Sequence, residues 1–82
     1  MGSAKRIKPV RLSGKLLLIR KNLDYSLSAM AATLSSGKIT LRKQDISHFE
    51  KGEREPNLII LLRYARLARI PVEVLIDDDL NL

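Results

Sequence analysis

Residues 42 to 49, RKQDISHF, gather guanidinium, ammonium, amide, hydroxyl and imidazole groups within eight positions. If the stretch is helical with Ile46 and Phe49 facing inward, helical geometry turns its other polar side chains outward. The outward set is Arg42, Lys43, Gln44, Ser47 and His48. A lysine suits guanine O6 or N7, and a glutamine can bind adenine N6 and N7 with two hydrogen bonds. The stretch therefore has the chemistry to recognise base edges by hydrogen bonding.

Catalysis is not expected from these groups. His48 is the only histidine, and because it is adjacent to Ser47 on a helix, the two side chains point in different directions and form no triad. The chain has no cysteine, which excludes disulfides and thiolate chemistry. The acids at 77–79 lack the spacing and turn glycine of a calcium loop, so we expect an acidic surface tail. No metal ion or cofactor is expected.

Composition favours one small helical domain. With 82 residues the chain must build an efficient core, and its hydrophobic residues (45%) are mainly Leu and Ile, with few aromatics (4%). The net charge of +6 favours a polyanionic partner, either nucleic acid or an anionic membrane surface. The longest apolar run, Leu58 to Leu62, is far too short to span a membrane, so we expect a soluble, cytoplasmic protein.

The charge is unevenly distributed. Basic residues without any acid crowd the first fifteen positions, whereas three acids occupy 77–79. The basic set is Lys5, Arg6, Lys8, Arg11 and Lys15. We expect this end to meet phosphate and the other end not to.

Apolar spacing predicts two helices in the first half of the chain. The first runs over 12–22, with Ser13 as its cap and Asp24 tolerating a positive φ after it. Its inward positions are Leu12, Leu16, Ile19 and Leu23. Ser26 caps a second helix, which buries Met30, Ala31 and Leu34.

We expect a turn over 35–41 whose residues Ile39 and Leu41 pack against the core. A third helix should follow over about 42–51, with Gly52 just after its end. Asp45 either caps this helix or selects cytosine N4, and we favour the cap.

Pro56 and Asn57 open a fourth helix over 58–69, with Arg63, Arg66 and Arg69 on its outer side. Its predicted inward stripe is Leu58, Leu61, Leu62, Ala65 and Ala68. A short fifth helix after Pro71 should turn Val72, Leu75 and Ile76 to the core. Some apolar residues lie off these stripes and could form a dimer surface, a partner site or a thicker core; we favour the dimer. They are Ile59, Ile60, Leu67, Val74 and Leu80.

Several motifs occur in a consistent order along the chain: Ile19-Arg20, Ser26, Met30-Ala31, ISHFEKGEREP at 46–56 and YARLARIPVEVLI at 64–76. In this combination they resemble the lambda-repressor-like, or Cro-repressor (XRE-type), helix-turn-helix family. The resemblance implies a compact all-α fold of five helices. The chain departs from the family at Leu27, where a glutamine is frequent, and in the longer turn between helices 2 and 3.

The resemblance also implies roles for particular residues. Arg20 would pair with Glu50 and fix the third helix on the first, while Lys43, Gln44, Ser47 and His48 would contact bases. Phosphate contacts would come from Lys38, Arg42, Lys51 and Arg54. The arm residues Lys5, Arg6 and Lys8 would follow the backbone or enter a minor groove, or else form a solvated tail.

We therefore expect a flexible basic arm (1–11), a helix-turn-helix domain (12–77) and an acidic and apolar tail (78–82). The expected function is sequence-specific binding of double-stranded DNA by a homodimeric transcriptional regulator. The alternative is an antitoxin-like or other protein-interaction module on the same fold. Membrane-surface binding is disfavoured because the apolar face of the fourth helix is needed for the core.

Overall fold

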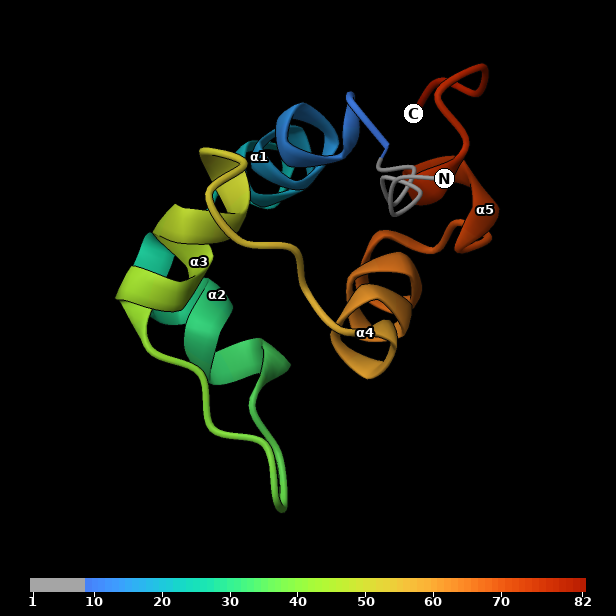
Figure 1. Cartoon of the computed structure of the whole chain (residues 1–82). Helices are drawn as coiled ribbons and strands as arrows, with labels where there is room; N and C mark the ends of the chain where they lie inside the picture. Colours follow the sequence, from blue (N-terminus) through green and yellow to red (C-terminus); the bar gives the residue numbers. More distant parts are fainter. Residues whose placement is uncertain (1–8) are drawn as a thin grey trace, which may run out of the picture.

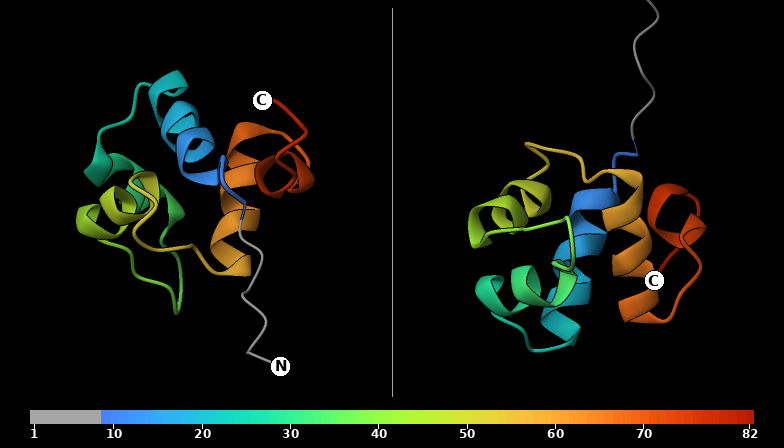
Figure 2. Two further views of the ribbon diagram at one scale, coloured as in Figure 1. Left: turned by 45° about the horizontal axis from the view of Figure 1, so that its top comes forward. Right: turned by 90° about the horizontal axis from the view of Figure 1, so that it is seen from below.

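The computed structural model describes residues 9–82, which fold into five α-helices. The helices are α1 (Leu12–Asn22), α2 (Leu27–Leu34), α3 (Lys43–Glu50), α4 (Leu58–Ala68) and α5 (Glu73–Ile76). In Figure 1, α2 and α3 lie on one side and α4 and α5 on the other, and α1 packs against α3, α4 and α5. Figure 2 shows α1 running between the two groups. The predicted all-helical class is confirmed.

The core is built from the apolar stripes of the first three helices, as their spacing predicts. Leu12, Leu16 and Ile19 of α1 are buried. They meet the buried residues Met30, Ala31 and Leu34 of α2 and Ile46 and Phe49 of α3. A period of three to four residues identified the inward face correctly in all three helices.

The inward face of α4 was predicted correctly at Leu61 and Ala65, which are buried, but wrongly at Leu58 and Ile60. Leu58, expected inside, is 81% exposed, whereas Ile60, expected on a dimer surface, is only 5% exposed. The buried residues are Ile60, Leu61, Tyr64 and Ala65. The helix opens with five consecutive apolar residues, so its sequence period does not select a face, and packing of the large Tyr64 ring decides it. No helix within residues 9–82 is long and apolar enough to cross a membrane.

Two further predictions about apolar residues fail near the C-terminus. Leu67, expected on a dimer surface, packs partly buried against the core. Ile76, expected inside, is 46% exposed because it is the last residue of the one-turn helix α5, where Leu75 takes the core position.

The helix ends follow the predicted local chemistry with one exception. The Ser26 hydroxyl accepts a hydrogen bond from Ala29 N (3.0 Å), and Asp24 takes the left-handed conformation (φ 58°) after α1. Gly52 does the same after α3 (φ 73°). Ser13 does not cap α1, because the helix already begins at Leu12 and Ser13 lies inside its first turn.

The lengthened connection between α2 and α3 is a β-hairpin. Ser36 and Ile39 exchange two backbone hydrogen bonds (both 2.9 Å), and Gly37 supplies the positive φ (53°) that the tight turn needs. The Ser35 hydroxyl accepts a bond from Leu41 N (2.8 Å) and closes the base. As predicted, Ile39 and Leu41 pack against the core, and the hairpin extends beyond the ends of both helices (Figure 1).

The basic N-terminal region and the acidic C-terminus bind one another. Lys15 is only 4% exposed, and its ammonium group donates to the carbonyl oxygens of Val74 (2.7 Å) and Asp77 (2.9 Å) at the end of α5. Arg11 donates to Asp78 O (2.7 Å) and Asn81 Oδ1 (2.6 Å). The expectation that this end meets phosphate therefore fails for the buried Lys15, and Arg11, although exposed, already holds the C-terminal segment.

Asp78 supplies the cap that Ser13 does not. Its carboxylate accepts hydrogen bonds from Val10 N (2.9 Å) and Arg11 N (3.0 Å), the amides that lead into α1. These two bonds hold the pKa of Asp78 below its usual range. A negative charge at this position also complements the positive end of the helix dipole.

We predict that Asp78→Ala lowers the melting temperature at neutral pH, because the start of α1 loses both bonds. The folded pKa lies below the unfolded value of about 3.9, so the contribution is complete above that pH and is lost as the pH falls through the folded pKa. Melting curves at a series of pH values should show the difference from wild type shrinking in acid.

The neighbouring Asp79→Ala is the matched control, because the Asp79 side chain is exposed and makes no contact with α1 among residues 9–82. Equal melting temperatures for the two variants would contradict the capping role of Asp78.

Candidate nucleic-acid interface

The outer face of α3 carries polar side chains that point to solvent. Ile46 and Phe49 are buried beneath the helix, while Lys43, Gln44 and His48 are exposed and Ser47 is half-buried. Lys43 and Gln44 are the first two residues of α3, and Ser47 and His48 follow one turn later. The structure thus places the four predicted base-contacting residues on one helix, with its N-terminal end most open.

Arg20 and Glu50 join α1 to α3 by a two-pronged ion pair. Arg20 Nε donates to Glu50 Oε2 (2.7 Å), and Nη2 donates to Oε1 (3.0 Å). The third guanidinium nitrogen, Nη1, donates to Tyr25 O (2.9 Å) just before α2. The side chains are 17% and 7% exposed, so the pair is largely shielded from water. The expected contact between the two residues is present, and it ties α1, α3 and the start of α2 together.

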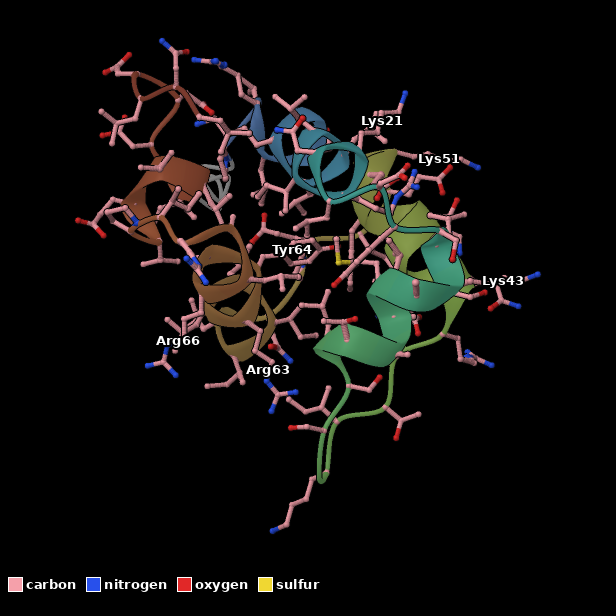
Figure 3. The ribbon with its side chains drawn as sticks, turned by 180° about the vertical axis from the view of Figure 1, so that it is seen from behind. Lys21, Lys43, Lys51, Arg63, Tyr64 and Arg66 are labelled. Atoms are coloured by element: carbon pink, nitrogen blue, oxygen red, sulfur yellow. The ribbon has the colours of Figure 1, made fainter. Side chains whose placement is uncertain are left out.

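Tyr64 of α4 lies beneath this pair. Its side chain is fully buried, and its hydroxyl has no hydrogen-bond partner among residues 9–82. Burial, together with the nearby Glu50 carboxylate, raises the pKa of Tyr64, so the phenol stays neutral. Figure 3 shows Tyr64 in the middle of the molecule, between α4 and the side that carries Lys43 and Lys51.

Asp45 starts α3 in the way we favoured. Its Oδ2 accepts a bond from Arg42 N (2.8 Å), and its Oδ1 accepts one from Arg54 Nη1 (2.7 Å). The backbone bond from Arg42 is the main reason that the pKa of Asp45 is lowered, and Arg54 adds to it. Arg54 also lies over the Phe49 ring, 5.5 Å from its centroid, so this predicted phosphate ligand is already partly engaged within the chain.

His48 also has an internal partner. Its Nδ1 lies 2.7 Å from Glu53 Oε1, and both side chains are about half exposed (46% and 54%). The contact fixes the ring with Nδ1 toward Glu53. His48 therefore presents its other nitrogen, Nε2, to any outside partner.

The remaining predicted phosphate ligands are exposed cations at separate points of this side. Lys38 lies at the hairpin turn, Arg42 precedes α3, and Lys51 follows it. Sequence reasoning missed Lys21, an exposed residue in the last turn of α1. Figure 3 shows Lys21, Lys43 and Lys51 along the same edge of the molecule. The sequence signal was available, because Lys21 follows Arg20 and falls off the apolar stripe of α1.

Comparisons with known proteins identify the arrangement. Neither a scan against protein-family models nor a search of curated proteins found a match. A search of solved structures matched the P22 c2 repressor protein, crystallised with synthetic operator 9T in the presence of Tl+. The TM-score is 0.70 at 22% identity, over 83% of this chain and 96% of that one. This chain has the lambda-repressor-like helix-turn-helix fold.

In this lambda-repressor-like fold, α2 and α3 form the helix-turn-helix, and the hairpin lengthens the turn between them. The predicted arm residues Lys5, Arg6 and Lys8 lie outside the described residues. Among the predicted dimer residues, Ile59 (51%) and Leu80 (39%) are exposed and Val74 is half-buried. Leu58, which was assigned to the core, joins Ile59 on the surface instead.

We predict that Glu50→Ala lowers the free energy of unfolding by roughly 3 kcal/mol, because it leaves a largely buried guanidinium without its carboxylate. Glu53→Ala removes a carboxylate from an exposed contact and should cost less than about 1 kcal/mol. Chemical denaturation of both variants measures the difference. Equal losses would mean that the Arg20–Glu50 contact contributes no more than a surface pair.

Tyr64→Phe should raise the free energy of unfolding by roughly 1 kcal/mol, because it removes a buried hydroxyl that has no partner among residues 9–82 and keeps the ring. Tyr25→Phe makes the same chemical change at a half-buried position and should leave stability unchanged. Denaturation curves again provide the measurement. A destabilised Tyr64→Phe protein would show that the hydroxyl is hydrogen-bonded in solution.

Proposed function

We propose that this protein binds double-stranded DNA in a sequence-specific manner and acts as a transcriptional regulator, with α3 inserted in the major groove. The observation that carries the proposal is the exposed polar face of α3, held at a fixed angle by the Arg20–Glu50 pair. An α-helix fits the major groove, where each base pair presents a distinct pattern of donors and acceptors. The fold likeness to a repressor described with a synthetic operator supports this proposal.

The order of residues along α3 favours reading from its N-terminal end. In helix-turn-helix proteins the first residues of the recognition helix contact base edges. Lys43 and Gln44 occupy these positions here, and both are exposed. Lys43 would donate to guanine O6 or N7, and Gln44 would form two bonds with adenine. Ser47 and the Nε2 atom of His48 would reach bases or backbone one turn further along.

Phosphate contacts would flank this helix. Lys51 directly follows α3, and Lys21 lies near it on the same edge of the molecule (Figure 3). Along the chain, Arg42 and the hairpin residue Lys38 precede α3. Cations on both sides of a reading helix fix its register on the duplex without carrying sequence information. Arg54 would contribute less than these four, because its guanidinium already binds Asp45.

We propose further that the regulator is a homodimer. Leu58 (81% exposed) and Ile76 (46%) line a shared groove of about 340 Å³, and Ile59 (51%) follows Leu58 on the surface. Burying these side chains against a second copy would remove apolar surface from water. A two-fold dimer would match a palindromic operator. This surface keeps Ile59 from the set predicted from sequence but omits Ile60, which belongs to the core, and Leu67, which packs partly buried against it.

Selection of bound duplexes from a randomised pool, at about physiological salt, tests the function. We expect enrichment of an inverted repeat whose half-sites lie about one helical turn apart. Non-specific phosphate binding would enrich no sequence, so salt-sensitive binding without enrichment would refute base reading. A single unrepeated half-site would refute the dimer and leave base reading intact.

We predict that Gln44→Ala costs roughly 1 to 3 kcal/mol of binding free energy on the selected site and relaxes discrimination at one position. Lys51→Ala is the control, because a phosphate ligand should weaken binding about equally on all sequences and reduce the salt slope by about one. Titrations on the selected site and on single-base variants, at several salt concentrations, separate the two patterns. If Gln44→Ala weakened binding equally on all sequences, Gln44 would not be a base-contacting residue.

A further inference from the structure

A groove with arginines at its rim lies between the end of α2 and the outer side of α4. Its lining residues are Thr33, Leu34, Ser36, Arg63, Arg66 and Leu67, and its volume is about 320 Å³. We refer to it as the arginine groove. Its leucines come from the edge of the core, so it combines an apolar floor with cationic walls.

The charged side chains that line the arginine groove are both arginines, Arg63 and Arg66. The two segments that build it, 25–41 and 56–72, contain Lys38, Arg63, Arg66 and Arg69 and not one acidic residue. Arg63 Nη1 donates a hydrogen bond to Leu34 O (2.7 Å), and this bond orients the guanidinium at the groove. Within residues 9–82 neither Arg63 nor Arg66 forms an ion pair. The groove therefore favours an occupant that offers carboxylates beside an apolar side chain.

The two arginines of the groove lie apart from α3, the helix proposed to enter the major groove. Figure 3 shows Arg63 and Arg66 projecting from α4 on a different side of the molecule from Lys43 and Lys51. A single straight duplex seated on α3 would leave the arginine groove open.

The chain itself carries a segment with the required chemistry. Residues 77–80, the acidic turn, are held in shape by Leu80 N donating to Asp77 O (3.1 Å) and Asp79 N donating to Asp77 Oδ1 (2.9 Å). Asp78 anchors the turn to α1. The Asp77 and Asp79 side chains are exposed and form no ion pair among the described residues, and Leu80 beside them is 39% exposed. The turn thus presents the Asp79 carboxylate, the Asp77 carboxylate with one oxygen bound by the Asp79 amide, and one apolar side chain in a preformed shape.

The acidic turn cannot reach the arginine groove of its own molecule. In Figure 1 the C-terminal segment lies at the top, whereas the end of α2 and the hairpin lie toward the bottom. Since Asp78 and Arg11 bind this segment to the start of α1, it is not free to cross that distance.

We propose that the arginine groove of one copy receives the acidic turn of a second copy in a head-to-tail contact. Asp77 and Asp79 would pair with Arg63 and Arg66, and Leu80 would cover Leu67 on the groove floor. Such a contact uses two different surfaces, so it is heterologous and leaves a free groove and a free turn at its ends. It can therefore add to the two-fold dimer proposed above. Its charges are partly exposed, so salt should weaken it.

Sedimentation velocity over a concentration series tests the contact with the intact chain and two charge reversals, Arg66→Glu and Asp79→Lys. We expect salt-sensitive association in the wild type and association roughly tenfold or more weaker in each variant. Mixing the two variants should restore association, because the intact turn of Arg66→Glu can still enter the intact groove of Asp79→Lys. A two-fold apolar dimer would persist in every sample and would not depend on mixing.

Arg69→Glu is the matched control, because it makes the same charge change at an exposed residue outside the groove lining. It should associate like the wild type, and circular dichroism should show all variants folded. The proposal is overturned if both reversals associate like the wild type, if mixing restores nothing, or if Arg69→Glu is as weak as Arg66→Glu. It is also overturned if the wild type shows no salt-sensitive association, in which case the groove serves a different acidic partner or none.

Discussion

The bidentate contact between Arg20 and Glu50 is the constraint on which the outward face of α3 depends. Neighbouring residues of an α-helix point about 100° apart, so a small rotation of α3 would exchange the side chains that it presents. The planar guanidinium donates two hydrogen bonds to the Glu50 carboxylate, which hold it in one orientation, and its third nitrogen donates to Tyr25 O. The helix is therefore fixed in rotation as well as in distance. Burial of Ile46 and Phe49 stabilises the packing of α3 against the core, and the ion pair fixes the orientation of α3.

The distribution of cations shows why net charge alone is a poor guide to where this protein would meet a polyanion. The chain carries a formal charge of +6, yet several of its basic side chains bind partners inside the molecule. Lys15 and Arg11 hold the C-terminal segment, and Arg63 binds the end of α2. The residues that stay exposed include Lys21, Lys43 and Lys51, which share one edge of the molecule. The position of a cation and its internal hydrogen bonds, rather than the total charge, thus decide which basic side chains are available at each surface.

The sequence was sufficient where local chemistry decides the structure. Period and capping predicted α1 to α3, the Ser26 cap and the positive φ of Asp24, because each depends on residues within one or two turns. Prediction failed where contacts between segments far apart in the sequence decide the structure. Asp78 caps α1 from 67 residues away, and no local pattern reveals that partner. In α4 the apolar run is compatible with several inward faces. Packing against the other helices therefore decides that Ile60 is buried and Leu58 is exposed. The four residues proposed to contact bases lie together on α3, as their spacing predicted, whereas the contacts that occupy Arg54 and His48 could not be predicted from the sequence.

Asp45 shows how one of these internal contacts bears on the proposed function. A carboxylate at the start of α3 stabilises the helix through its dipole and through the Arg42 amide, but it would repel a phosphate backbone close by. Arg54 occupies the second carboxylate oxygen at 2.7 Å and stacks on Phe49, so the helix keeps its cap while the local charge is neutralised. In the proposed complex, Arg54 would therefore act mainly through Asp45 rather than as a phosphate ligand. Loss of Arg54 would then leave the Asp45 charge exposed and weaken binding most at low salt, where the repulsion between the carboxylate and the phosphates is least screened.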